Sequence, residues 1–223
     1  MTDIRCIIFD CDGVLIDSEM ISARIIVEEL AHEGVEVNFP YIQKHFLGRS
    51  FTKVAAHILE NFDVAVADDF EARYRSNLLA AFSKELRPMP GIFEVLDSVR
   101  LPRCVATSSS PNRVRNSLGL AGLAHYFGEN VFTASQVQNG KPAPDLFLYA
   151  AAAMQASPAD CLVIEDSAMG VEAALRAKMT VWRFTGGSHF IGFEAPVPSG
   201  AERVQEFDNW AAFPELLAAE LNG

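Results

Sequence analysis

The chain has 223 residues, 50% of them hydrophobic, which is enough for a packed core and for one domain with an insertion. Its 29 acidic residues outnumber its 18 basic ones, and the formal net charge of -11 argues against nucleic acid as a partner. No N-terminal segment resembles a signal peptide, and no apolar run is long enough to span a membrane, so we expect no membrane partner.

Five short apolar runs predict β-strands. They lie at residues 4–9, 103–107, 130–133, 161–164 and 180–184, and helical patterns separate most of them. This alternation predicts an α/β fold with a parallel sheet and right-handed crossovers. The four cysteines lie in or directly after the runs and have no metal-type spacing. They predict reduced, structural thiols and a cytoplasmic protein.

The stretch after the first strand has a different character. Helical patterns cover residues 20–32, 41–46, 53–61 and 68–84, and no convincing strand interrupts them. Turn-forming residues stand at both ends of this stretch, which suits a hinge. Near the other end of the chain, residues 209–221 predict a terminal helix, and residues 186–198 predict a loop region whose role the sequence leaves open.

Two carboxylates follow the first predicted strand, in the order Asp10-Cys11-Asp12-Gly13-Val14. Ligands of parallel sheets bind beyond the carboxyl ends of the strands, so Asp10 and Asp12 stand where chemistry is usually placed. The alternative is an ordinary Asx turn at the surface. A calcium loop is excluded, because the third acidic position and the glycine that follows it are missing.

A second acidic cluster, Glu165-Asp166-Ser167 with Gly170 beyond, follows the fourth predicted strand. If the two strands are neighbours, their carboxylates converge. Each pair would then repel by about 1 kcal/mol in water and about 4 kcal/mol near a protein surface, so a cation is needed. Oxygen ligands without a histidine or cysteine cluster favour Mg²⁺ over zinc. The alternative is that each cluster caps the helix that follows it.

Two further segments suit a bound phosphate. Thr107 and Ser108 end the second predicted strand and open a helix, whose free N–H groups can bind an anion. Lys141 stands in Gly-Lys-Pro, a stiff turn that can aim its ammonium group. Taken singly, the serine run reads as a helix cap and the lysine as solvated surface. Together with the carboxylates they predict a phosphate site.

These segments resemble the haloacid dehalogenase superfamily, in its β-phosphoglucomutase-like branch of sugar-phosphate phosphatases. Four motifs stand in the family's order: Asp10-Cys11-Asp12-Gly13-Val14, Thr107 with Ser108, Lys141, and Glu165-Asp166-Ser167 with Gly170. The resemblance implies a Rossmann-like core with a parallel sheet, formed by residues 1–17 and 88–223. It also implies that residues 18–87 form an inserted α-helical cap.

The resemblance implies roles for the acidic residues. Asp10 is the nucleophile that forms an aspartyl phosphate, and Asp12 is the general acid and base. A Mg²⁺ cofactor is held by Asp10, Asp166 and the carbonyl group of Asp12. Glu165 stands among the metal residues as a more distant or water-bridged ligand.

The resemblance implies that other residues bind the phosphate and the rest of the substrate. Thr107, the backbone beside it at Ser108, and Lys141 would bind the transferring oxygens. Arg49, in Leu47-Gly48-Arg49-Ser50, resembles a cap arginine that relatives place against a distal anionic group, which favours a phosphosugar or a sugar-acid phosphate. The alternative is an exposed arginine between two helices.

We therefore expect a Mg²⁺-dependent phosphatase of a small-molecule phosphate ester, present as a monomer or weak homodimer. One alternative is a phosphosugar mutase, but Ser22 stands where such mutases carry a histidine on the first cap helix. A dehalogenase would leave Asp12 and the second acidic cluster without a role. A non-catalytic metabolite-binding protein would not need the complete set of motifs.

Overall fold

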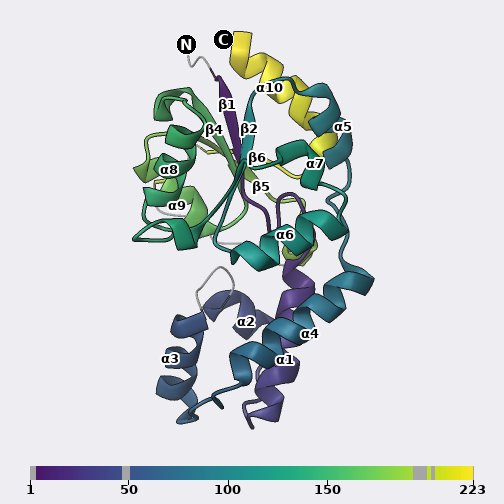
Figure 1. Ribbon diagram of the computed structural model, residues 1–223, viewed down its shortest axis with the longest axis vertical. Coiled ribbons are helices and arrows are strands. Elements are labelled where there is room, and N and C mark those ends of the chain that lie inside the picture. Colours follow the sequence, from purple (N-terminus) through teal and green to yellow (C-terminus); the bar gives the residue numbers. More distant parts are fainter. Residues whose placement is uncertain (1–3, 47–50, 193–199, 202–203, 223) are drawn as a thin grey trace. The chain divides into compact units, whose positions relative to one another are not determined.

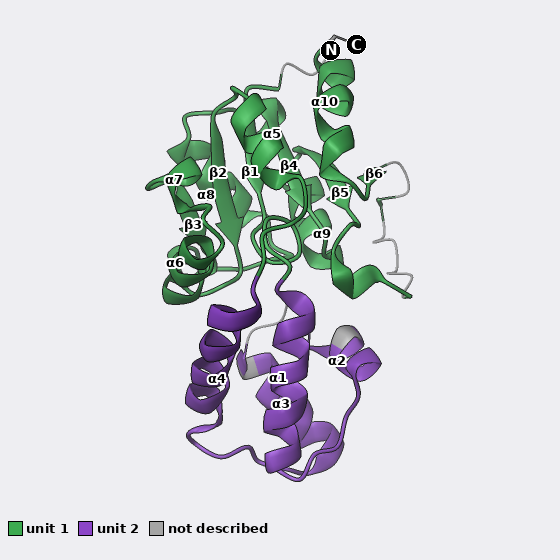
Figure 2. Ribbon diagram, turned by 90° about the vertical axis from the view of Figure 1, so that its right-hand side faces the viewer, with its two compact units in different colours: residues 1–17, 87–223 green, residues 18–86 purple. Residues whose placement is uncertain are grey.

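The computed structural model describes residues 4–46, 51–192, 200–201 and 204–222. The chain divides into two compact units (Figure 2). Met1–Asp17 and Arg87–Gly223 form the larger unit, and Ser18–Leu86 forms the smaller one. Every strand in the described ranges belongs to the larger unit. None of the described helices combines the length with the apolar character that a transmembrane segment requires.

The larger unit is built on a six-stranded sheet in which all neighbouring strands are parallel. The strand order is β3-β2-β1-β4-β5-β6, which confirms the predicted α/β fold with a parallel sheet. The strands are β1 (Cys6–Phe9), β2 (Arg103–Thr107), β3 (Val131–Thr133), β4 (Cys161–Glu165), β5 (Thr180–Phe184) and β6 (Gln205–Phe207). Strand β6 was not predicted, because only Phe207 of its three residues is buried and it forms no apolar run.

Helices cover both faces of this sheet (Figure 1). Helices α8 (Asp145–Ala153) and α9 (Ala168–Arg176) pack on one face, and α5 (Ile92–Ser98), α7 (Ala124–Phe127) and α10 (Phe213–Asn222) lie on the other. Helix α6 (Pro111–Leu120) follows β2. The predicted terminal helix over 209–221 begins later than expected, because the Asn209 side chain caps a separate 3-10 turn, η4 (Trp210–Ala212).

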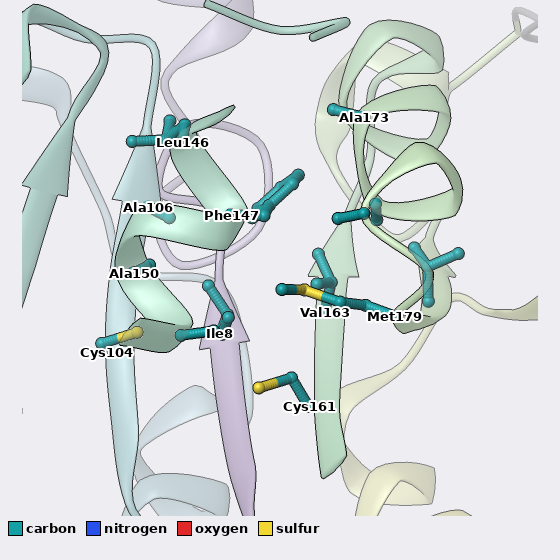
Figure 3. Packing of buried hydrophobic residues seen from close by; sticks show 14 of the residues in the cluster. Ile8, Cys104, Ala106, Leu146, Phe147, Ala150, Cys161, Val163, Ala173 and Met179 are labelled. Atoms are coloured by element: carbon teal, nitrogen blue, oxygen red, sulfur yellow. The ribbon is translucent and has the colours of Figure 1, made fainter. Parts of the chain in front are cut away.

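The alternation of side chains along β1 explains why this strand reads as a continuous apolar run. Cys6 and Ile8 pack toward α8 and α9, where Ile8 lies among apolar side chains of both helices and of β4 (Figure 3). Phe9 points to the opposite face, with its ring centroid 5.9 Å from that of Trp210. Because both faces of a parallel sheet are buried, both sets of side chains are apolar.

The smaller unit is helical in its described residues. Its helices are α1 (Glu19–His32), α2 (Phe39–His45), α3 (Phe51–Phe62) and α4 (Phe70–Glu85), and each end lies within two residues of its predicted position. They enclose an apolar core of their own. Glu29 is buried between α1 and α4, where it accepts hydrogen bonds from Arg73 at 3.2 Å and Asn77 at 2.6 Å. Its charge is therefore compensated inside the unit.

Candidate active site

The first and second acidic motifs meet because β1 and β4 are neighbours in the sheet. Phe9 of β1 pairs with Ile164 of β4, and the Asp10 N–H donates to the Ile164 carbonyl at 2.9 Å. On its other side, Phe9 pairs with Val105 of β2. The residues that follow these strands therefore share one edge of the sheet, as expected for a parallel α/β fold.

Lys141 connects the two acidic motifs at this edge. Its Nζ donates to Asp10 Oδ1 at 2.6 Å, to Glu165 Oε1 at 2.6 Å and to the carbonyl oxygen of Ala106 at 3.0 Å. The Lys141 side chain is only 3% exposed, and its Nζ lies 4.8 Å from the centroid of the Phe147 ring. A solvated surface lysine, the alternative left open by the sequence, does not describe this residue.

Burial and charge oppose each other at this pair. Burial raises the pKa of Asp10 well above its usual range, and the nearby negative charges of Glu165, Asp166 and Asp12 raise it further, while Lys141 lowers it. Burial by itself would lower the pKa of Lys141, but Asp10 and Glu165 outweigh it and raise that pKa. Lys141 therefore remains a cation, and its charge favours the ionised form of Asp10 while burial opposes it.

Glu165 and Asp166 are neighbours with different surroundings. Besides binding Lys141, Glu165 accepts hydrogen bonds through Oε2 from the Ser167 N–H at 2.8 Å and from its hydroxyl at 3.0 Å. A Cβ atom at Gly170 would lie 1.7 Å from Glu165 Oε1, which explains the glycine of this motif. Asp166 is 5% exposed. Burial raises the pKa of the Asp166 carboxyl, and the negative charge of Glu165 raises it further.

The Asp12 carboxylate is held by two residues that the sequence analysis did not assign. Its Oδ2 accepts a hydrogen bond from the Ser109 hydroxyl at 2.6 Å, and its Oδ1 pairs with Arg113 Nη2 at 2.7 Å. Both partners come from the segment in which β2 leads into α6. The available signal was the hydroxyl run after the strand, followed by an arginine in the first turn of a helix.

The predicted phosphate-binding residues differ in exposure. Thr107 is 1% exposed, and its hydroxyl oxygen accepts a hydrogen bond from the Ser109 N–H at 3.1 Å. Ser108 is exposed, and α6 begins with Ser110 as its cap. Thr107 ends the strand that carries the Ala106 carbonyl bound by Lys141, so the two predicted phosphate segments lie together. Arg49 lies outside the described residues.

The acidic residues at this edge can offer only a small set of metal ligands. Among the described residues, no group of three or more His, Cys, Asp or Glu side chains converges to hold a metal ion. Contacts with Lys141 and Ser167 engage Glu165, and contacts with Ser109 and Arg113 engage Asp12.

The carboxylates of Asp10 and Asp166 are also buried, and Lys141 contacts Asp10 through Oδ1. A Cβ atom at Gly13 would lie 2.0 Å from Asp166 Oδ2, so the Asp166 carboxylate lies directly against the first motif. Carboxylate and main-chain carbonyl oxygens are the donors that a hard cation such as Mg²⁺ prefers, so the chemistry of Asp10, Asp166 and the Asp12 carbonyl fits the metal that the resemblance implies.

Comparisons with known proteins agree with this arrangement. A family model described as haloacid dehalogenase-like hydrolase matches residues 4–178. The chain is 29% identical over 220 residues to 6-phosphogluconate phosphatase of Escherichia coli (strain K12), covering 98% of this chain and 97% of that protein. It is 31% identical over 176 residues to a fructose-1-phosphate phosphatase of the same organism, covering 78% and 92%.

A solved structure is similar along the whole chain. It is a HAD family hydrolase from Deinococcus radiodurans R1 with bound phosphate and sodium. The TM-score is 0.77 and the sequences are 29% identical, with 98% of this chain and 97% of that chain covered.

Proposed function

Because the chain belongs to the haloacid dehalogenase-like hydrolases, we propose that it is a Mg²⁺-dependent phosphatase of phosphorylated sugars or sugar acids that acts through a phosphorylated Asp10. The match to the family model confirms the resemblance seen in the sequence. Membership of this family, together with named phosphatases among the relatives, makes the chain a phosphoric monoester hydrolase. The specific class of ester, the metal and the covalent step are our proposal.

One observation carries the proposal: a buried carboxylate at a strand end is held by a buried lysine at 2.6 Å. A carboxylate can attack phosphorus only when it is ionised, and burial opposes ionisation. Lys141 offsets that effect at Asp10 while Glu165 fixes the ammonium group. In the proposed first step, an Asp10 oxygen bonds to phosphorus as the bond between phosphorus and the ester oxygen breaks.

Asp12 is the proposed general acid and base. It donates a proton to the departing alcohol in the first step, and it takes a proton from the water that hydrolyses the phosphorylated Asp10. These two transfers return Asp12 to its starting state and release the alcohol and inorganic phosphate. Ser109 and Arg113, at 2.6 and 2.7 Å, hold its carboxylate next to the nucleophile's segment.

Asp10, Asp166 and the Asp12 carbonyl would hold Mg²⁺, by their oxygen chemistry and by family resemblance. A bound Mg²⁺ would supply positive charge that offsets the repulsion between the nucleophile and an anionic phosphate. Glu165 stays a proposed, more distant or water-bridged ligand, and its carboxylate also anchors Lys141 and Ser167.

The transferring phosphate would be bound by Thr107, Ser108 and Lys141. Buried Thr107 offers a hydroxyl, the start of α6 offers main-chain N–H groups near Ser108, and Lys141 offers a positive charge. Arg49 stays the proposed partner of a distal anionic group on the substrate. The two phosphatase relatives act on a phosphorylated sugar acid and a phosphorylated sugar, which is why we propose these classes for this chain.

The deciding experiment is a panel of phosphate esters assayed for released phosphate, in Mg²⁺ and in EDTA. The panel holds sugar phosphates, sugar-acid phosphates and nucleotides, and Asp10→Asn protein is the matched control. We expect the wild-type chain to release phosphate from the sugar phosphates and sugar-acid phosphates in Mg²⁺ but not in EDTA. The Asp10→Asn protein should release none. No release from any ester by folded protein in Mg²⁺ would contradict the proposal.

The same preparation separates a phosphatase from a mutase. A hexose 1-phosphate and a bisphosphate primer are supplied, and products are followed by phosphorus NMR. We expect inorganic phosphate as the main product. Stoichiometric formation of the 6-phosphate with little free phosphate would replace the phosphatase with a mutase.

A further inference from the structure

The turn after β5 places a buried histidine against Asp166. His189 belongs to the 3-10 helix η3 (Ser188–Phe190), which lies within the predicted loop region 186–198. The residue is 6% exposed, and its Nε2 lies 3.1 Å from Asp166 Oδ2. This is the distance of a hydrogen bond or an ion pair. The catalytic steps proposed above do not use this side chain.

Two glycines leave the space that this contact needs. A Cβ atom at Gly187 would lie 2.6 Å from His189 Cε1. A Cβ atom at Gly13 would lie 3.1 Å from the same ring atom and 2.0 Å from Asp166 Oδ2. Any side chain at either position would displace the imidazole or the carboxylate, so the backbone on both sides is shaped around this pair.

The turn is also tied to the rest of the larger unit. The Ser188 N–H and hydroxyl donate to Asp17 Oδ1 at 3.2 and 2.7 Å, which fixes η3 to the segment after the first acidic motif. Arg183 Nε donates to the main-chain oxygen of Asp166 at 3.2 Å. Asp166 is thus held through its backbone by Arg183 and faces His189 with its side chain.

We propose that His189 is a positioning residue that orients the Asp166 carboxylate for Mg²⁺, an inference that rests on the proposed function. A donor on one oxygen restricts rotation of the carboxylate, so less conformational freedom is lost when an ion binds. Residues that hold metal ligands in this way typically contribute about 10–100-fold to metal affinity or activity. We expect His189 to affect the metal requirement rather than the binding of the phosphate ester.

The test compares His189→Phe, which keeps a ring but has no donor, with His189→Gln, whose amide restores one. The control is His125→Phe, because His125 is an exposed histidine of the same unit. Mn²⁺ binding is measured by electron paramagnetic resonance without substrate, and the Mg²⁺ concentration for half-maximal activity is measured with it. We expect His189→Phe to weaken Mn²⁺ binding and to raise the Mg²⁺ concentration for half-maximal activity, each by about 10–100-fold. His189→Gln and His125→Phe should stay close to wild type in both measurements.

The KM for the phosphate ester at saturating Mg²⁺ should not change in His189→Phe. If phenylalanine prevents folding, His189→Asn carries the same expectation, because its shorter amide does not reach Asp166. Wild-type ion binding in a folded donor-free variant overturns the inference. Equal weakening in His189→Gln also overturns it. The proposed function fails separately, when the wild-type chain releases no phosphate or needs no Mg²⁺.

Discussion

Replacing Lys141 by methionine tests whether the acidic edge depends on this one buried cation. Methionine keeps most of the side-chain volume and removes the charge. In the wild-type chain Lys141 Nζ lies 2.6 Å from both Asp10 Oδ1 and Glu165 Oε1. In Lys141→Met both carboxylates lose this partner while they remain buried, with Asp10 only 7% and Glu165 only 1% exposed.

The magnitude follows from the burial of the pair. Removing one partner of a buried ion pair costs about 3–5 kcal/mol, because the other charge is left uncompensated. For a chain of this size, each kcal/mol lowers the unfolding temperature by about 2–4 °C. We therefore expect the unfolding temperature of Lys141→Met to fall by roughly 6–20 °C at neutral to mildly alkaline pH.

The loss should depend on pH. Burial raises the pKa of Asp10 in the folded chain, so its contribution to stability is present below the unfolded pKa and is lost as the pH rises through the folded pKa. Lys141 limits this loss by lowering the pKa of Asp10. Without Lys141 that pKa rises further. The deficit of the variant should thus be larger near about pH 8 than near about pH 5, because a lower pH favours the protonated, uncharged form of Asp10.

The assay is thermal unfolding followed by circular dichroism in EDTA, so that no metal replaces the missing charge. Lys178→Met is the matched control, because Lys178 is an exposed lysine of the same unit. Adding Asp10→Asn to Lys141→Met removes one of the uncompensated charges and should restore part of the stability. The reasoning is refuted if Lys141→Met and Lys178→Met unfold at the same temperature near pH 8. It is also refuted if the loss of unfolding temperature in Lys141→Met is the same at both pH values.

Further predictions concern the nucleophile, the metal and one glycine. Asp10→Asn should lose activity by several orders of magnitude without losing its fold, measured as phosphate release and circular dichroism on one preparation; near-normal turnover would exclude Asp10 as nucleophile. EDTA should abolish phosphate release, Mg²⁺ should restore it, and Ca²⁺ should substitute poorly; activity that ignores EDTA would exclude the metal. Gly170→Ala should lower the free energy of unfolding, measured in urea, by about 1–3 kcal/mol or more, since its Cβ would lie 1.7 Å from Glu165 Oε1. Gly119→Ala, with nothing within 4 Å of its Cβ, should not; equal behaviour of the two would refute the steric argument.

The parts of the site that the sequence predicts are those fixed by strand ends. A short apolar run followed by a carboxylate can be recognised locally, and parallel strands deliver such residues to one edge of the sheet. This reasoning places Asp10 and Glu165 together, and the structure shows both bound to Lys141. The alternation of elements predicts the parallel sheet, but the sequence leaves the strand order open, and the structure supplies the pairing of β1 with β4.

The parts that it does not predict depend on which side chains meet across the fold. Ser109 and Arg113 reach Asp12 from almost a hundred residues or more away in sequence, and their residue types are equally suited to an exposed helix start. Likewise β6 has no apolar run, because it is a short edge strand with two exposed residues. Periodicity reports on burial, and these features are only partly buried.

The balance of charges at the acidic edge argues that stability and chemistry draw on the same contacts. Lys141 and Arg113 form ion pairs with the carboxylates of the first motif, Lys141 with Asp10 at 2.6 Å and Arg113 with Asp12 at 2.7 Å. Each lies on a segment that follows a different strand, so the charges become balanced only when the sheet is assembled. An anionic phosphate would add negative charge to a site whose carboxylates already repel one another. Lys141 already offsets the charges of Asp10 and Glu165, so its charge alone is not enough for the phosphate. This is the physical reason for proposing Mg²⁺ in addition to the lysine and hydroxyl groups that would bind the phosphate.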